Sequence, residues 1–302
     1  MAQKTSSPQD GTPKDPKKQG PKPEYPQPPI DAPGSIDEMN PKADHGEQSY
    51  EGLGRLKDRV ALITGGDSSI GRAVAIAFAR EGAHVLLSYL PEEEADARDT
   101  QQWIEKAGRK AVLLPGDIQD EQHCQAMIDI AFAQFGTLDI LVNNAAFQRT
   151  HEKIEEFTSD EFDRTFRTNV YAMFWLCRAV LPRMTPGACI INTASRQAYN
   201  PSPELLAYAP TKAAIVNFTK ALSKLAMKQG VRVNAVAPGP VWTPLIPATL
   251  PEEHVRQFGE GTAFERAAQP VEVAPLFVFL ASNESRFVTG EVYGVTGGEM
   301  PY

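Results

Sequence analysis

A tyrosine and a lysine four residues apart open an apolar stretch of the chain. Tyr208 and Lys212 lie in the segment YAPTKAAIVNFTKALSKLA, whose apolar residues recur with helical periodicity. Because four residues make about one helical turn, both side chains emerge on one face. An ammonium about 4 Å from a phenol stabilises the phenolate by about 4 kcal/mol at an effective dielectric near 20, which is about 3 pKa units. We therefore expect Lys212 to bring the pKa of Tyr208 near neutrality, which suits general acid–base catalysis.

Two further polar residues are candidates for the same site. Ser195 follows the apolar segment CIINTA, where a strand should end, and its hydroxyl can hold a substrate oxygen against Tyr208. Asn169 lies among apolar neighbours within a helical stretch. For the helix that carries Tyr208, Ser202 is the expected N-cap, and Pro210 predicts a slight kink because it removes one hydrogen bond.

The octapeptide TGGDSSIG at 64–71 joins an apolar run to an alternating helical stretch. Gly65 would permit a tight turn, Gly71 would let helix and strand approach closely, and the helix N-terminus would offer N–H groups to a pyrophosphate. Ser69 occupies the position where such turns usually have glycine. We expect a modified turn that still binds, with Ser69 at negative φ and its Oγ directed at the cofactor; a positive φ would imply weak binding. Glycine-rich turns also serve as plain connections.

Six short apolar segments alternate with helical stretches and define the expected fold. Strands that are apolar on both faces and separated by helices indicate a parallel sheet covered on both sides, which is an α/β, single-domain, doubly wound (Rossmann) fold. Ligands of this fold bind at the carboxyl ends of its strands. The predicted strands are residues 60–64, 84–89, 110–117, 138–144, 188–195 and 231–238, and the predicted helix C-caps are Gly82, Gly108, Gly136 and Gly230.

Composition excludes several classes of protein. With 302 residues, 42% hydrophobic and 23% charged, the chain resembles an ordinary globular protein. The net charge of −8 argues against general affinity for nucleic acid or anionic membrane. Cys124, Cys177 and Cys189 share no close spacing, so we expect no metal site and reduced thiols. Without an apolar leader or a run of about twenty apolar residues, the expected location is the cytoplasm.

The first 50 residues differ in character from the rest. Of 25 prolines, 10 precede residue 42, and such a stretch buries too little apolar surface to offset its ordering entropy. We therefore divide the chain into a Pro-rich extension, 1–50, and a Rossmann-fold domain, 51–302. Residues 1–20 are expected to be disordered and 21–50 to form an extended arm, unless the whole extension is a solvated tail without function. The candidate anchors of the arm are Tyr25, Ile30, Met39 and Tyr50.

Six motifs in this order resemble the short-chain dehydrogenase/reductase superfamily, in its single-domain branch. They are TGGDSSIG, the NNAA that ends at Ala146, Asn169, Ser195, YAPTK and PGPVWTP. The resemblance covers about residues 56–298, and the Pro-rich extension is similar to that of a bacterial subgroup. Ala146 stands where glycine is commoner.

The resemblance implies a role for each matching residue. Asn169, Ser195, Tyr208 and Lys212 would be catalytic: Lys212 would also grip the nicotinamide ribose, and Asn169 would hold a water that links the lysine to solvent. Asp117 would contact adenine, and residues 244–265 would form a lid over the substrate. The implied cofactor contacts are Gly65, Asp67, Ser68, Ser69, Ile70, Gly71, Ser88, Tyr89, Asp117, Ile118, Asn143, Ala145, Tyr208, Lys212, Pro238, Gly239, Val241 and Thr243. A homotetramer is also implied, through helices around 120–135, 160–183 and 270–281 and the last strand.

The end of the second predicted strand, VLLSYLPEEE, bears on the cofactor. Relatives that prefer NAD usually place an acid where Tyr89 stands, and here there is none. Relatives that prefer NADP usually offer Arg or Lys nearby, and Ser68, Tyr89 and Leu90 supply no such charge. Ser88, Tyr89 and Arg72 can still meet a phosphate through hydrogen bonds. We therefore predict NADP(H) ahead of NAD(H).

The leading hypothesis is an enzyme that transfers a hydride between NADP(H) or NAD(H) and a small or medium aldehyde, ketone or alcohol. The alternative is a dinucleotide-binding regulatory protein without catalysis, which would explain Ser69 and Ala146 but not the persistence of Ser195, Tyr208 and Lys212. A sugar-nucleotide epimerase of the longer branch shares the tyrosine and lysine, yet it needs a larger carboxyl-terminal domain than the one that follows PGPVWTP. The expected partner is a small molecule, with no nucleic acid and no membrane.

Overall fold

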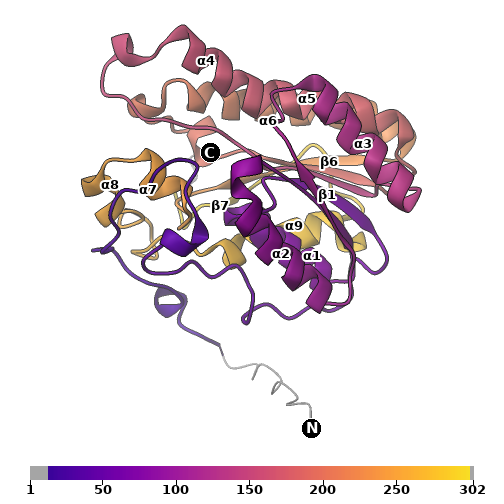
Figure 1. Cartoon of the computed structure of the whole chain (residues 1–302), viewed down its shortest axis with the longest axis horizontal. Helices are drawn as coiled ribbons and strands as arrows, with labels where there is room; N and C mark the ends of the chain where they lie inside the picture. The colour runs from indigo at the N-terminus through magenta and orange to yellow at the C-terminus, as the bar shows by residue number, and fades with distance from the viewer. Residues whose placement is uncertain (1–12, 300–302) are drawn as a thin grey trace.

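Seven parallel strands form one sheet in the order β3-β2-β1-β4-β5-β6-β7. The computed structural model describes residues 13–299 (Figure 1). The strand order reverses between β1 and β4, which is the switch point where doubly wound folds bind their ligands. The predicted fold class is confirmed, and β7 adds a strand to the six segments expected from the sequence. The strands are β1 Val60–Thr64, β2 His84–Tyr89, β3 Ala111–Pro115, β4 Ile140–Asn143, β5 Cys189–Thr193, β6 Arg232–Pro238 and β7 Val292–Val295.

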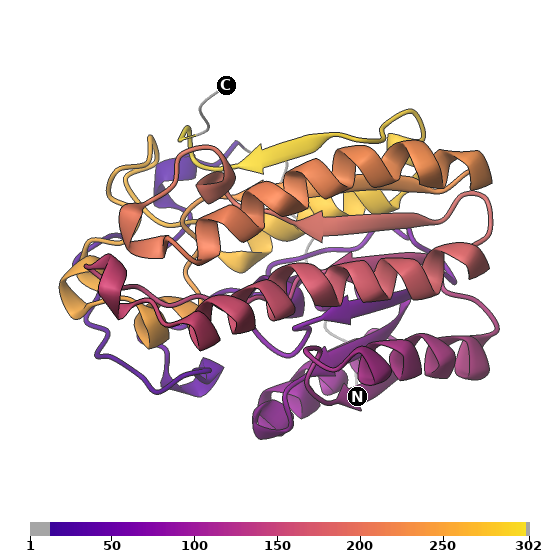
Figure 2. The same cartoon turned by 90° about the horizontal axis from the view of Figure 1, so that it is seen from above.

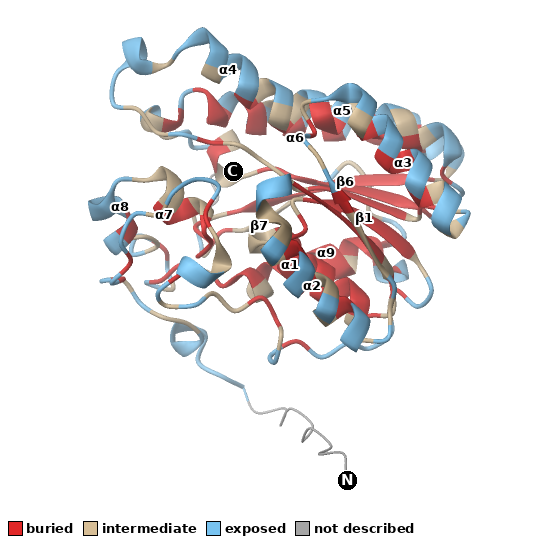
Figure 3. Ribbon diagram, in the orientation of Figure 1, coloured by how far each residue is buried: buried red, intermediate tan, exposed pale blue. Residues whose placement is uncertain are grey.

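Alternate residues of the strands enter two separate apolar cores. In β1, Leu62 belongs to one core while Ala61 and Ile63 belong to the other; in β4, Leu141 and Val142 divide in the same way. Both faces of the central strands are therefore buried, as the colours of Figure 3 show. This burial explains why the strand segments are apolar throughout rather than alternating.

Helices cover both faces of the sheet. Helices α1, α2 and α9 lie on one face, and α3, α5 and α6 lie side by side on the other (Figures 1 and 2). A π-helical turn, Arg167–Tyr171, joins α4 to α5. The four glycines predicted as C-caps all have positive φ. The helices are α1 Ser69–Arg80, α2 Glu94–Lys106, α3 Glu121–Phe135, α4 Ser159–Phe166, α5 Ala172–Val180, α6 Tyr208–Ala226 and α9 Pro270–Ala281.

The start of α6 differs from the expectation. Ser202 precedes a separate 3-10 turn, Pro203–Leu205, without a side-chain cap hydrogen bond, and α6 begins only at Tyr208. Pro210 therefore lies in the first turn, where a backbone N–H has no acceptor within the helix. No kink is required there, because the proline removes no helical hydrogen bond.

The segment after β6 forms two short helices, α7 Leu245–Thr249 and α8 Glu252–Arg256. These helices and the adjoining Trp242 build a third, small apolar core with residues of the N-terminal arm. In Figure 1 the arm passes α7 and α8 before it reaches α2.

The arm follows a defined course over the described residues. Tyr25, Met39 and Tyr50 are buried and Ile30 is half-buried. Residues 13–20 were expected to be disordered, but they contain a 3-10 turn, Pro16–Lys18. Arg266 Nη2 donates to the Pro16 carbonyl at 2.8 Å, which explains why this polar stretch is held. The rest of that expectation, residues 1–12, lies outside the described chain.

Between residues 13 and 299, none of the helices has the length and apolar content that a bilayer-spanning helix needs. No group of three or more His, Cys, Asp or Glu side chains in that part of the chain is arranged to hold a metal ion.

Candidate active site

The end of β5 and the first turns of α6 bring Ser195, Tyr208 and Lys212 together. Tyr208 forms a hydrogen bond with Ser195, and the hydroxyl of Ser195 also accepts from Gln197 N at 3.2 Å. Nζ of Lys212 lies 5.2 Å from the centroid of the Tyr208 ring. The geometry thus joins a hydroxyl, a phenol and an amine at the carboxyl edge of the sheet.

Burial controls the protonation of this pair. It raises the pKa of Tyr208, and the hydrogen bond with Ser195 only partly opposes this rise. It also lowers the pKa of Lys212 to about 7. The prediction that Lys212 brings the pKa of Tyr208 near neutrality therefore differs from this structure, because spacing along a helix carries no information about desolvation. Tyr208 is a protonated phenol at neutral pH.

Lys212 is held by the backbone of the neighbouring strand. Its side chain is only 2% exposed, and Nζ donates to the carbonyl oxygen of Thr193 at 2.8 Å. The sequence did not indicate this partner, since a backbone carbonyl is independent of residue type. The contact fixes the amine beside the last residue of β5.

Asn169 occupies the π-helical turn between α4 and α5. Its Oδ1 accepts from Phe147 N at 2.7 Å, and its Nδ2 donates to Thr211 Oγ1 at 3.0 Å. Thr211 in turn donates to the Tyr208 carbonyl at 2.6 Å. Asn169 therefore braces the first turn of α6, and π-helical turns of this kind are frequent at functional sites.

A small cavity lies between Asn169 and the strand ends. Its volume is about 10 Å³, and Asn143, Asn169 and Thr193 contribute to its lining. The buried Oδ1 of Asn143 has no hydrogen-bond partner. One water needs about 10–15 Å³ and polar partners, so the cavity fits a single water.

Gly65 and Gly71 shape the turn after β1. Gly65 has φ +61°. A Cβ on Gly71 would come within 1.8 Å of the Gly65 carbonyl oxygen, so only glycine fits there. The strand-to-helix approach predicted from the octapeptide is therefore present, and it leaves the first N–H groups of α1 directed at the carboxyl edge of the sheet.

The prediction for Ser69 was wrong, because its φ is +55° rather than negative. Ser69 is the first residue of α1, where the chain leaves the extended Ser68 (φ −138°). The turn imposes a left-handed residue whether or not glycine is present, and a small serine accepts it at a cost of about 1–2 kcal/mol. The positive φ therefore follows from the path of the turn, and the implication of weak binding does not follow from it. Ala146, the other replacement, does not have a positive φ, so its backbone needs no glycine.

Asp67, in the same turn, is a buried carboxylate with other acidic residues nearby. It is 1% exposed, and neither carboxylate oxygen has a hydrogen-bond partner. Burial, and then the Asp96 carboxylate, raise the pKa of Asp67. Burial, and then the charge of Asp67, raise the pKa of Glu93. The sequence analysis missed Glu93 and Asp96, although the acidic run EEEAD after β2 was a signal for them.

The groups that were expected to meet a phosphate have other partners. Arg72 is 3% exposed and pairs with Glu47 and Asp99. The Tyr89 hydroxyl donates to Glu94. Ser88 is buried, and its carbonyl accepts from Gly65 N at 2.8 Å. The expectation that Arg72 and Tyr89 hydrogen-bond a phosphate is therefore not supported.

The remaining predicted contacts lie at the carboxyl ends of the strands. Asp117 is exposed and accepts from Gln119 N at 2.9 Å, next to the buried Ile118. Asn143 Nδ2 donates to Asn192 Oδ1 at 2.8 Å, and Ala145 N donates to Thr64 Oγ1 at 3.1 Å.

The loop after β6 carries the last predicted contacts. Pro238 ends the strand, and a Cβ on Gly239 would come within 2.8 Å of Thr296 Cα. Val241 and Thr243 are buried on either side of Trp242. These residues share the carboxyl edge of the sheet with the glycine turn and the Lys212 amine.

Replacing Ser69 by glycine should relieve the left-handed strain. The relief of about 1–2 kcal/mol exceeds the about 0.4–1 kcal/mol that glycine's unfolded-state freedom costs, so the melting temperature should rise by about 1–3 °C. Thermal unfolding of Ser69→Gly measures this. Ser68→Gly is the control, because its extended backbone has no strain to relieve. A loss of stability in Ser69→Gly equal to that in the control would contradict the strain.

The buried Lys212 predicts a pH-dependent stability. The pKa of Lys212 in the folded state is about 7, below its ordinary value of 10.5. Between these two pH values the folded state binds fewer protons than the unfolded state. The protein therefore loses stability as the pH falls from 10.5 to 7. The free energy of unfolding of Lys212→Met, relative to that of the wild type, should therefore be higher at pH 6 than at pH 10. Denaturant titrations at both pH values measure the difference, and Lys220→Met, on the exposed side of the same helix, should show no such change. A gain independent of pH would rule out the depressed pKa.

Several known proteins resemble this chain over most of its length. Residues 65–299 match a family model described as Enoyl-(Acyl carrier protein) reductase. The chain is 53% identical over 268 residues to the uncharacterised oxidoreductase YghA of Escherichia coli, covering 88% of this chain and 91% of the relative. It is 43% identical to an NADPH-dependent aldehyde reductase 1, chloroplastic, of Arabidopsis thaliana, covering 89% and 95%.

Solved structures agree as well. A short chain dehydrogenase of Burkholderia cenocepacia in complex with NADP has a TM-score of 0.76 and 31% identity, covering 81% of this chain and 99% of that one. A 3-ketoacyl-(acyl-carrier-protein) reductase of Brucella melitensis complexed with NADH has a TM-score of 0.74 and 31% identity, covering 82% and 100%. The chain therefore belongs to the short-chain dehydrogenase/reductase superfamily of oxidoreductases.

Proposed function

We propose that this protein transfers a hydride between a nicotinamide dinucleotide and the carbonyl or hydroxyl carbon of a small or medium aldehyde, ketone or alcohol. The observation that carries the proposal is the cluster of half-buried Ser195 with buried Tyr208 and Lys212 at the carboxyl edge of the sheet. The aldehyde reductase among the similar proteins supports an aldehyde substrate.

Each residue of the cluster has a distinct task. When bound, the nicotinamide supplies or accepts the hydride. Ser195 holds the substrate oxygen, and Tyr208, whose raised pKa keeps it protonated, donates its phenolic proton to the oxygen as negative charge develops. Lys212, with its pKa near 7, interacts with the phenolate that remains. A water in the cavity beside Asn169 would return the proton from solvent.

The acid–base role differs between the two directions. Tyr208 is ready as an acid at neutral pH, whereas oxidation of an alcohol needs it as a base. Reduction is therefore the favoured direction near pH 7, and oxidation should require alkaline pH. The alternative, a binding protein without catalysis, gains no support, because the three groups lie together rather than apart.

Tyr208→Phe should reduce aldehyde-dependent NADH or NADPH oxidation by at least about 100-fold, because phenylalanine has no proton to donate. Its dissociation constant for the dinucleotide, measured by fluorescence titration, should stay within about threefold of the wild type. Tyr199→Phe is the matched control on the adjacent loop and should retain activity. Turnover by Tyr208→Phe at the wild-type rate would refute the assignment, and absence of turnover by the wild type over a broad panel of aldehydes and ketones would favour the binding protein.

The choice of cofactor depends on the charges around the adenosine end. The sequence predicts NADP(H), and the NADP complex among the similar structures is consistent with that. The local charges favour the opposite choice: beyond burial, the Asp96 carboxylate raises the pKa of Asp67, and the charges of Asp67 and Asp96 raise the pKa of Glu93. A 2′-phosphate about 5 Å from one carboxylate would be repelled by about 3 kcal/mol at an effective dielectric near 20. We therefore infer NAD(H) as the preferred cofactor, because the carboxylates at this end of the site disfavour a 2′-phosphate.

This inference predicts tighter binding of NADH than NADPH, by more than tenfold in both dissociation constant and kcat/KM. Asp67→Asn should tighten NADPH binding by about tenfold, because it removes the repulsion, and should leave NADH binding within about threefold. Asp163→Asn removes the same charge from an exposed position on α4 and should change neither. Tighter binding of NADPH than NADH by the wild type would restore the original prediction.

Two further expectations are proposals as well. The apolar side chains Ile130, Tyr171 and Phe174 are exposed on α3, on the π-helical turn and on α5, respectively. They support the predicted homotetramer, because large exposed apolar groups mark interfaces. The cytoplasmic location stays a prediction.

A further inference from the structure

The N-terminal arm contacts both ends of the candidate dinucleotide site. We propose that residues 21–50 are a positioning element of that site, which holds the nicotinamide end through Trp242 and the adenosine end through Arg72 at a fixed separation. The proposal rests on the proposed function, because it assumes that the site takes a dinucleotide. Its subject is a segment outside the matched family region, which begins at residue 65.

The first contact is an aromatic stack at the nicotinamide end. The rings of Tyr25 and Trp242 lie 4.2 Å apart at an angle of 21°, and Trp242 Nε1 donates to the Pro41 carbonyl at 2.8 Å. Trp242 stands between Val241 and Thr243, both predicted cofactor contacts. Any shift of the arm at Tyr25 therefore moves the loop that would meet the nicotinamide.

The segment after β6 depends on the arm for its core. The third apolar cluster contains Tyr25 and Met39 of the arm and, from the other side, Trp242, Ile246, Val255 and Ala267. Its two short helices, five residues each, are too short to be stable alone. The arm therefore supplies the apolar surface on which this lid packs.

The second contact bridges the lid and α2. Ile30 N donates to the Pro247 carbonyl at 3.3 Å, and a Cβ on Gly34 would come within 3.1 Å of the Pro244 carbonyl oxygen. One residue further along, the Ser35 hydroxyl and Ile36 N donate to the Asp96 carboxylate at 3.3 and 3.1 Å. The lid follows β6 and α2 follows β2, and β1, β4 and β5 lie between those strands. The arm thus crosses the strand ends along which the dinucleotide would lie.

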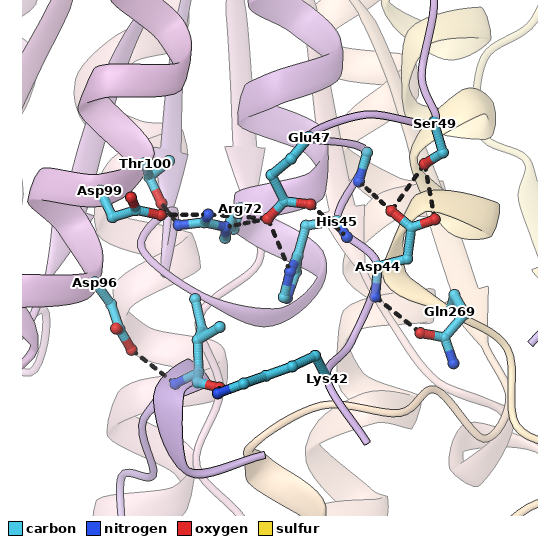
Figure 4. A network of polar contacts seen from close by, with 12 residues as sticks. Lys42, Asp44, His45, Glu47, Ser49, Arg72, Asp96, Asp99, Thr100 and Gln269 are labelled. Atoms are coloured by element: carbon cyan, nitrogen blue, oxygen red, sulfur yellow. Dashed lines mark hydrogen bonds and ion pairs between the residues drawn. The ribbon is translucent and has the colours of Figure 1, made fainter. Parts of the chain in front are cut away.

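The third contact reaches the glycine turn through a relay of side chains (Figure 4). Glu47 Oε1 accepts from Arg72 Nη2 at 2.9 Å, and Arg72 Nη1 donates to Thr100 Oγ1 at 2.9 Å. Thr100 then donates to the Asp67 carbonyl at 2.8 Å. The arm therefore holds the glycine turn in place at the backbone of Asp67, beside the adenosine end of the candidate site.

Glu47 presents an ionised carboxylate to this relay at neutral pH. Burial alone would raise the pKa of Glu47, but His45 and Arg72 together lower it to about 2. Arg72 is buried, so it needs a carboxylate partner. Glu47 supplies one that is only partly exposed, whereas the partner on α2, Asp99, is itself more than half exposed. Glu47 is therefore the arm residue through which the turn is held.

Two variants separate the two ends. Glu47→Gln should raise the dissociation constants of both NADH and ADP by about five- to thirtyfold, because ADP fills only the adenosine end. Tyr25→Leu should raise the dissociation constant of NADH by a similar factor. It should leave the dissociation constant of ADP within about twofold of the wild type, because it disturbs only the loop at Trp242. Fluorescence titration and calorimetry measure these constants, and kcat at saturating cofactor should remain within about twofold in both variants.

Glu24→Gln is the matched control. It removes a carboxylate from the same arm, at an exposed ion pair with Arg256, and should change no dissociation constant. Melting temperatures are recorded for every variant. Lower melting temperatures with unchanged dissociation constants would overturn the proposal and leave the arm a purely stabilising element. Failure of the wild type to bind NADH, NADPH and ADP would instead refute the proposed function and the positioning role together, so the two failures are distinct.

Discussion

The burial of one lysine is the constraint on which the site depends. Lys212 has lost almost all contact with water and has one backbone acceptor, the Thr193 carbonyl. Burying an ammonium costs several kcal/mol unless partners compensate, so the end of β5 and the start of α6 must stay in register. That register also brings Tyr208 to Ser195. One strand–helix register therefore positions all three side chains. The desolvation that makes the burial of the lysine costly also raises the pKa of the phenol.

Local patterns in the sequence were enough for six of the seven strands, for the glycine C-caps of the helices and for the grouping of Ser195, Tyr208 and Lys212. Apolar runs, glycines at helix ends and the four-residue spacing of Tyr208 and Lys212 each act over a few residues. Desolvation does not, and for that reason the protonation of Tyr208 could not be predicted from spacing. Arg72 shows the same limit: its partner Glu47 belongs to the arm, and only the folded chain brings the two together.

The turn after β1 shows how a neighbour can decide a residue's conformation. Gly71 packs directly against the Gly65 carbonyl, which fixes the path of the chain between them. Ser69 must then adopt a left-handed backbone although it is not glycine. The prediction of a negative φ came from the residue type alone, whereas the demand comes from the closure of the turn. The path of the chain requires the left-handed conformation at this position, and the residue type determines how much free energy it costs.

The stack of Tyr25 on Trp242 joins segments from opposite ends of the polypeptide. During synthesis the arm leaves the ribosome first, and the surface that receives it is completed only when nearly the whole sequence has been translated. Until then the arm must remain extended and must not associate with other chains. Its prolines and charges suit that wait, because they disfavour both helices and intermolecular β-pairing.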